Sequence, residues 1–382
     1  MSMLKYPINY NTVQESNIFL RKLWAELNDI KPMGWQLFPN KHGNTVYLGI
    51  STLGEISFDY SKKGCVKTLY IDNSSNEIEI TKAIQAAKSN PMKEYSFILE
   101  LTSDKNLEIH EASTSTCNIF SKDGRVYLKA GFEAYSDWDL DKILPSKFLP
   151  IEAVFYEYTH CIFHIEKVKY AAGKFVSENQ VLPQYNYEWI DSDERPESSA
   201  GQILLPNEFF NLIEYILNDK TYDDKIELLI NSSNLLFSTA KLIDDIPCSY
   251  SSINADIVNS MACSTFEPLS LILDSNVERC ESCGNMVFSI TKKIKNMCSK
   301  YVSAEFGKYV SNVIYKHRST FLHEGHPETT QTHNRISCPQ IDPHTGSIML
   351  SHGMVRVLTL DYSAYLFRRI SHDYFGSVTF SV

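Results

Sequence analysis

The sequence is poor in the residues that keep a chain unfolded, and it has no stretch apolar enough to cross a membrane. Only 15 of its 382 residues are Gly and 14 are Pro, whereas 43% are hydrophobic. This composition excludes disordered and fibrous chains. No window approaches the roughly 18 to 20 unbroken apolar residues of a transmembrane helix, and residues 1–22 lack the charged-then-apolar pattern of a secretory leader. We therefore expect a folded protein that does not enter a membrane.

Several catalytic motifs are also missing. The chain has no Gly-x-Gly-x-x-Gly, Walker or Gly-x-Ser-x-Gly element, which argues against nucleotide hydrolysis and α/β-hydrolase chemistry. Its nine cysteines are odd in number and scattered, so we expect reduced thiols in the cytoplasm rather than a disulfide framework.

The chain lacks the overall positive charge that dominates non-specific binding to nucleic acid, because its net charge is −10. The charge is uneven, however. Residues 279–335 carry nine Lys or Arg against four acidic residues, a local balance of 9 − 4 = +5. This segment predicts a surface that binds a polyanion such as RNA, with Lys293, Lys308 and Lys316 as contact candidates. An ordinary solvated helix face is the alternative interpretation.

The length and a change of composition predict two domains. A chain of 382 residues exceeds the usual size of one hydrophobic core. Between residues 183 and 202 the composition shifts to Asp, Glu, Ser and Pro, which is typical of a loop or linker. We predict an α+β domain over residues 1–202, followed by an all-α helical bundle over residues 203–382.

Hydrophobic periodicity predicts the elements of both parts. In the first part, helices are expected at 12–28 and 77–89, a hairpin at 46–50 and 56–60, and strands at 66–71, 95–101, 107–110, 126–132 and 153–168. Glu157, His160, His164 and Glu166 lie in this last run, where a solvated or ladder-paired strand face would explain them. In the second part, helices are expected from Pro206 and over 223–244, 251–273, 285–300, 302–323 and 348–375.

The stretch Tyr315–Gly325 carries the strongest candidates for chemistry. It ends a predicted helix with Arg318 and His323 five positions apart. A guanidinium binds phosphate through two parallel hydrogen bonds, and a histidine transfers protons near neutral pH. Together they could cleave RNA without a metal: His323 would move the proton of a ribose 2′-hydroxyl, and Arg318 would stabilise charge on the phosphorane. Five residues are about 140° apart on an ideal helix, so one copy alone makes a poor site.

This stretch resembles the Arg, four to six residues, His signature of HEPN domains. Tyr-x-x-Arg-Ser-x-x-x-His, with Gly two positions on, is similar to the Apea-like group within them. The resemblance covers roughly residues 205–375. It implies a helical bundle that pairs about a twofold axis, so that Arg318 and His323 of both copies meet in one composite site. It also implies a metal-independent endoribonuclease acting on tRNA or mRNA, in antiviral defence or a toxin system, with no cofactor.

Some features leave other interpretations open. The residue after Arg318 is Ser319, where catalytic relatives often have Asn, Asp or His, and this favours a catalytically silent HEPN module for dimerisation or RNA binding. His317, Ser319 and His326 are supporting candidates beside the pair. A regulatory or antitoxin partner is a further expectation. Without the resemblance, the simpler interpretation is that Arg318 forms a salt bridge, for example with Glu324, and that His323 caps the C-terminus of its helix.

A metal site is the remaining alternative. Cys280 and Cys283 have the Cys-x-x-Cys spacing that lets two thiolates reach one zinc ion, but a second such pair is missing. The order His323-Glu324-Gly325-His326 is not the His-Glu-x-x-His of zinc hydrolases. A zinc-stabilised interaction protein is therefore a third hypothesis, and unliganded cysteines are the simpler interpretation.

Overall fold

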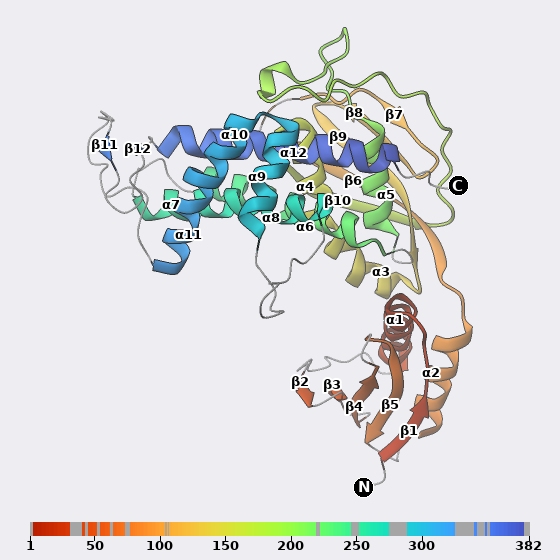
Figure 1. Ribbon diagram of the computed structural model, residues 1–382. Coiled ribbons are helices and arrows are strands. Elements are labelled where there is room, and N and C mark those ends of the chain that lie inside the picture. Colours follow the sequence, from red (N-terminus) through yellow and green to blue (C-terminus); the bar gives the residue numbers. More distant parts are fainter. Residues whose placement is uncertain are drawn as a thin grey trace.

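The computed structural model shows sheets in the N-terminal part and helices in the C-terminal part (Figure 1). The structure describes residues 3–30, 40–42, 45–51, 54–61, 64–72, 77–103, 105, 107–218, 222–245, 252–274, 289–324, 340–341, 348–349 and 352–377. This agrees with the predicted order of an α+β part before a helical part.

The first lobe is a five-stranded antiparallel sheet with the order β1-β5-β4-β3-β2. Its strands are β1 (Met3–Pro7), β2 (Asn40–His42), β3 (Thr45–Ser51), β4 (Gly54–Tyr60) and β5 (Val66–Asp72), and its helices are α1 (Val13–Ile30) and α2 (Glu77–Ser89). Apolar residues of both helices, including Phe19 and Ile80, share one core with Leu69 and Ile71 of β5. The predicted hairpin is confirmed, because β3 pairs antiparallel with β4.

The second sheet is also antiparallel, with the order β10-β6-β9-β8-β7. Its strands are β6 (Lys93–Ser103), β7 (Ala112–Ser113), β8 (Cys117–Lys122), β9 (Arg125–Ala134) and β10 (Phe163–Ala172). Alternate residues of β9 are buried, as expected for a strand with one face on the core. Asp123 and Gly124 turn β8 into β9 with φ of 54° and 71°, the left-handed conformation that a two-residue hairpin turn requires.

Helices fill the rest of the molecule. They are α3 (Asp137–Ile143), α4 (Phe148–Thr159), α5 (Asn207–Leu217), α6 (Asp224–Asp245), α7 (Ser252–Ser264), α8 (Phe266–Leu273), α9 (Ile290–Tyr301), α10 (Ala304–Tyr309), α11 (Tyr315–Glu324) and α12 (His352–Ser377). Short 3-10 helices span Leu144–Lys147 and Ser192–Glu194, and β11 (Gln340–Ile341) pairs with β12 (Ile348–Met349).

The main hydrophobic core crosses the predicted domain boundary near residue 202. One cluster joins Phe97 and Leu128 of the second sheet to Phe209 of α5 and Phe367 of α12. Residues 183–202 contain no helix longer than a 3-10 turn, as predicted for a loop, yet Trp189 within them is 1% exposed. The second sheet and the helices therefore pack as one body, and Figure 1 shows the first lobe set apart at one end.

The predicted strand over residues 153–168 is wrong in its first half. Residues 148–159 form α4, and only β10 follows as a strand. The run is rich in β-branched and aromatic residues, which favoured a strand. Its buried residues Ile151, Val154, Phe155 and Tyr158 instead follow helical spacing. Pro150 fits because first-turn N–H groups have no partner within the helix.

Three other predictions need correction. The strand expected at 107–110 is only an isolated bridge between Ile109 and Ile203. The helix expected at 251–273 breaks at Thr265 into α7 and α8. The helix expected at 302–323 is interrupted by a π-helical turn over Val310–Ile314. In the described part of the chain, no helix combines the length and the hydropathy needed to span a membrane.

Gly307 marks the closest approach of α10 to α9. A Cβ atom at this position would lie 2.6 Å from the carbonyl oxygen of Lys295 and would also clash with the side chain of Ser299. We expect Gly307→Ala to lower the free energy of unfolding by on the order of 2 kcal/mol, because a backbone atom cannot move aside as a side chain can. Gly376→Ala in α12 is the control, since nothing lies within 4 Å of its Cβ position.

Chemical denaturation of both variants measures this difference. Alanine has the higher helix propensity, so Gly376→Ala should match or exceed the wild type in stability. Equal stability of Gly307→Ala and the wild type would mean that α9 and α10 pack less closely than described.

Candidate functional site

The predicted catalytic stretch begins directly after a disturbance in its helix. α10 ends at Tyr309, the π-helical turn covers Val310–Ile314, and α11 begins at Tyr315. Single π-helical turns occur frequently at functional sites. The π-helical turn changes the direction in which the following residues face. The face on which Arg318 lies therefore cannot be found by counting 3.6 residues per turn from the start of the predicted helix at residue 302.

Arg318 lies against α7 and α8. Its Nη2 forms an ion pair with Glu267 at 2.8 Å, and its Nε donates a hydrogen bond to the hydroxyl of Ser264 at 3.2 Å. The guanidinium carbon lies 5.3 Å from the centre of the Tyr315 ring. With 18% of the side chain exposed, the guanidinium is held in place but still reaches solvent.

Glu267 accepts from two side chains of α11. The Tyr315 hydroxyl donates to its Oε1 at 2.9 Å, the same oxygen that pairs with Arg318. Burial and the nearby charge of Glu267 raise the pKa of Tyr315, so this hydroxyl remains a donor at neutral pH. The salt bridge considered for Arg318 therefore exists, but with Glu267 of α8 rather than with Glu324. Glu267 and Tyr315 position the guanidinium.

His323 has a different environment. It lies in the last turn of α11 and is exposed, and it makes no hydrogen bond or ion pair with any residue in the described part of the chain. The helical positions of Arg318 and His323 differ by about 140°, and the two side chains share no contact. Within one copy, the structure therefore holds the guanidinium in place, while the imidazole has no hydrogen-bond or ion-pair partner among the described residues.

The other predicted contacts are distributed unevenly. Ser319 is half-buried, whereas Lys308 and Lys316 are exposed. Lys293 is 8% exposed, and its ammonium donates to the carbonyl oxygen of Asp274 at 2.7 Å. Of the three lysines, Lys308 and Lys316 are thus the more accessible to a polyanion.

Several candidates lie outside the described residues. They are His326, Cys280, Cys283 and the side chain of His317. The described residues contain no group of three or more His, Cys, Asp or Glu arranged to hold a metal ion. The zinc hypothesis for Cys280 and Cys283 stays a prediction.

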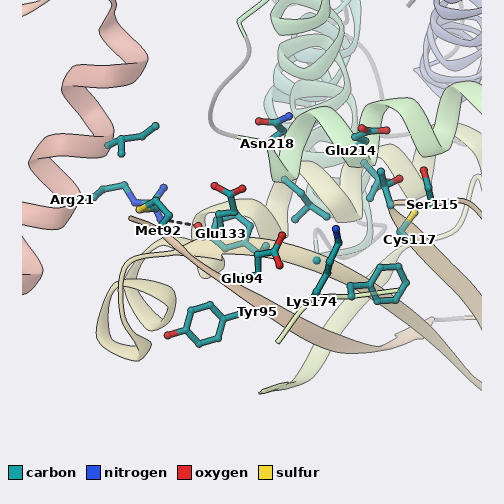
Figure 2. Close-up of a pocket in the computed structure, with 17 residues that line it drawn as sticks. Arg21, Met92, Glu94, Tyr95, Ser115, Cys117, Glu133, Lys174, Glu214 and Asn218 are labelled. Atoms are coloured by element: carbon teal, nitrogen blue, oxygen red, sulfur yellow. Dashed lines mark hydrogen bonds between the residues drawn. The ribbon is translucent and has the colours of Figure 1, made fainter. Parts of the chain in front are cut away.

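A pocket of about 250 Å³ lies where the first lobe meets the body. Figure 2 shows Arg21 of α1 on one side, Glu94, Glu133 and Lys174 in the middle, and Glu214 of α5 on the other. Arg21 also joins the lobes, because its Nε and Nη2 donate to the carboxylate of Asp139 at 3.0 and 2.8 Å. Burial raises the pKa of Glu214. The pocket thus contacts both the first lobe and the first helix of the C-terminal part.

The predicted solvated strand face is confirmed for His164 and Glu166, which lie exposed on β10, whereas Glu157 and His160 belong to a buried polar cluster. Glu157 is fully buried in α4, and His160 is its left-handed C-cap with φ of 51°. Burial raises the pKa of Glu157 to about 8 and lowers that of His160 well below its usual value. Both lie beside Arg368, which is 0% exposed. Burial disfavours the charged form of each group, so the site favours a protonated Glu157 and a neutral His160.

The chain was compared with protein-family models, with curated proteins and with solved structures. None of them matches it. The HEPN resemblance therefore rests on residues 315–325 and the helical C-terminal half alone.

The sequence did not indicate the partners of two α12 residues. Arg368 and His372 bond to Glu157 and Glu208, which lie 211 and 164 positions earlier in the chain. His372 was visible only as one of several histidines near the end of the sequence. No local pattern in the sequence indicates contacts at such separations.

Proposed function

We propose that the protein is a metal-independent endoribonuclease of HEPN type, active as a homodimer. The observation that carries the proposal is the division of roles on α11. Arg318 is fixed by Glu267 and Ser264, while His323, five positions on, is exposed and makes no hydrogen bond or ion pair with the residues that the structure describes. A fixed cation and a free imidazole suit charge stabilisation and proton transfer, respectively.

The reaction would use the ribose 2′-hydroxyl as nucleophile. His323 takes its proton as the oxygen attacks phosphorus, Arg318 stabilises the pentacoordinate phosphorane, and the 5′-oxygen leaves with a proton supplied by a second imidazole. On α11, His323 supplies one proton-transfer group per copy. The second would come from His323 of the other copy, which is why the proposal includes a homodimer.

The surface around His323 is compatible with pairing. Leu322, the preceding residue, is 52% exposed, and Ile257 of the neighbouring helix α7 is 39% exposed. α7 and α11 pack against each other, and exposed apolar side chains on such helices are available to an interaction surface. Exposed Lys308 and Lys316 would bind the RNA backbone as phosphate contacts without sequence preference.

The N-terminal part would sense a trigger or recruit a partner. The pocket of about 250 Å³ between α1, the second sheet and α5 supports this role, because a ligand there would contact both parts of the chain at once. If a trigger ligand increases RNA cleavage by the wild type, Glu214→Leu should abolish that increase.

The direct experiment is cleavage of labelled tRNA and mRNA by the purified protein in excess EDTA. The wild type should cleave with the chelator present, and Arg318→Ala and His323→Ala should not. His164→Ala is the matched control, since His164 is an exposed histidine on β10. Cleavage that stops on chelation, or that survives in both α11 variants, would contradict the proposal.

A catalytically silent HEPN module is the second candidate function. It is favoured by the ion pair itself, because Glu267 neutralises part of the charge that Arg318 would offer to a phosphate. Such a module would bind RNA or dimerise without cleaving. In that case Glu267→Gln should strengthen RNA binding while leaving cleavage absent.

A further inference from the structure

A second Arg–His pair lies on α12, in a groove far from α11 in sequence. The groove has a volume of about 470 Å³ and runs between residues 184–188 and the α12 residues Arg369 and His372. Residues three apart on a helix are neighbours on one face, with Cβ atoms about 5–6 Å apart. Arg369 and His372 therefore line one groove within a single copy, whereas Arg318 and His323 lie about 140° apart on their helix.

His372 is oriented by a buried carboxylate. Its Nδ1 lies 2.9 Å from Oε1 of Glu208, whose side chain is 7% exposed. A carboxylate only accepts hydrogen bonds, so Nδ1 carries the proton and the other ring nitrogen, Nε2, is left for a ligand. The His372 ring is 46% exposed and stacks on Tyr187 with ring centres 4.0 Å apart.

The helix dipole of α5 and a hydrogen bond from Tyr187 stabilise the negative charge of Glu208. Glu208 lies in the first turn of α5, where the helix dipole favours an anion. The Tyr187 hydroxyl donates to its Oε2 at 2.5 Å. Burial and this hydrogen bond raise the pKa of Tyr187, so Tyr187 acts as a donor. Glu208 and Tyr187 are positioning residues that fix the imidazole at the groove.

Arg369 has a partner that a ligand can displace. Its Nη1 forms an ion pair with Glu188 and lies 3.1 Å from the Tyr365 hydroxyl. The side chain of Glu188 is 65% exposed. Exposed ion pairs contribute only about 0–1 kcal/mol, and a phosphate bound by a guanidinium through two hydrogen bonds is a stronger partner.

We propose that this groove binds a phosphate group between Arg369 and His372. The phosphate would replace Glu188 at the guanidinium and accept a hydrogen bond from the imidazolium that forms when Nε2 takes up a proton. Glu208 stabilises that imidazolium through Nδ1. The ligand class is a phosphate monoester, as found in a free nucleotide or at an RNA end. The site does not depend on the proposed ribonuclease activity of α11.

Calorimetric titration of the full-length protein tests the site, with inorganic phosphate, adenosine 5′-monophosphate and adenosine as probes. Phosphate and the nucleotide should bind, and adenosine should not. Arg369→Gln and His372→Gln should each weaken binding by about tenfold or more, as expected for loss of a charge-assisted hydrogen bond. Glutamine at residue 372 keeps an N–H donor for Glu208, so the fold is preserved.

Two controls separate this site from α11 and from general folding defects. In Arg318→Ala and His323→Ala, phosphate should still shift the imidazole NMR signals of His372, whatever the effect of these substitutions on RNA cleavage. The imidazole NMR signals of His372 should shift on adding phosphate, and those of exposed His164 should not. A 5′-phosphorylated RNA oligonucleotide that binds more tightly than the nucleotide would identify RNA ends as the source.

Three results would overturn the proposal. They are unchanged affinity in both α12 variants, binding of adenosine equal to that of the nucleotide, and an unshifted His372 signal at saturating phosphate. Failure of RNA cleavage would not bear on it, and a failed titration would leave the α11 proposal intact.

Discussion

Replacing His323 with alanine should lower the rate of RNA cleavage by about 100-fold or more, the usual contribution of a positioned acid or base. The side chain is exposed and makes no contact with the described residues, so its loss should leave stability unchanged. A large loss of rate without loss of stability separates a chemical role from a structural one. Single-turnover cleavage and thermal unfolding of the same preparation provide both measurements.

Arg318 offers a sharper comparison. Arg318→Ala should remove cleavage to a similar extent, while Arg318→Lys should keep the charge but lose the two-donor geometry that a phosphorane requires. Glu267→Gln tests whether Glu267 positions the Arg318 guanidinium, because glutamine still accepts a hydrogen bond from Tyr315 but carries no charge opposite Arg318. Cleavage rates within about twofold of the wild type in Arg318→Lys would show that charge alone is needed, contrary to the usual advantage of Arg at phosphate.

Mixing the two inactive variants tests the composite site. A dimer of one Arg318→Ala chain and one His323→Ala chain retains one arginine and one histidine. If both copies contribute to one site, mixed dimers should recover part of the activity that neither variant has alone. A mixture as inactive as its components, with subunit exchange demonstrated, would argue that each copy acts by itself.

The second large effect is expected at Arg368. Its Nη1 and Nη2 donate to the carbonyl oxygens of Glu157 and Trp189, each at 2.7 Å, and the guanidinium carbon lies 3.5 Å from the centre of the Trp189 ring. Arg368→Met should lower the free energy of unfolding by about 3 kcal/mol, because both carbonyl groups lose their donor in a buried site. Chemical denaturation measures the change.

The loss of the buried charge of Arg368 has an opposing effect on the free energy of unfolding. Removing a buried charge can itself stabilise a protein, and burial lowers the pKa of Arg368 to about 10, which shows that its charged form is disfavoured. The orphaned carbonyl groups should outweigh this gain. Arg369→Met is the matched control on the same helix, since its ion-pair partner Glu188 is 65% exposed and a pair that reaches solvent in this way should contribute less than about 1 kcal/mol. An Arg368→Met protein as stable as the wild type would reverse the balance.

Much of the fold was predictable because its signals are local. The helix α1, the β3–β4 hairpin and α6 follow from hydrophobic spacing within a few residues. Pro206 correctly marked the start of α5, where it is the N-cap. The failure at residues 153–159 is also instructive. β-branched and aromatic residues there favour a strand, but Tyr158 and Phe155 are buried against other helices, and that tertiary contact decides the outcome.

The candidate site was predictable only in part. The sequence indicates Arg318 and His323 as a pair on one helix, but not that Glu267 and Ser264 would hold the guanidinium, because these residues lie on two other helices. It likewise gives no sign of Glu208 beside His372. Such contacts arise from the packing of helices, which no local pattern encodes.

The position of α12 in the chain has a consequence for synthesis on the ribosome. The buried residues of the first-lobe core lie between Phe19 and Ala87, and Leu4, Tyr6, Ile8 and Tyr10 pack against them, so this lobe should fold while the remainder is still being translated. The body cannot: Tyr158 of α4 bonds to Ser371, 213 positions later. α7, whose Ser264 accepts a hydrogen bond from Arg318, also packs against α12. If the protein cleaves RNA, its nuclease part would therefore be assembled only after α12 has been translated.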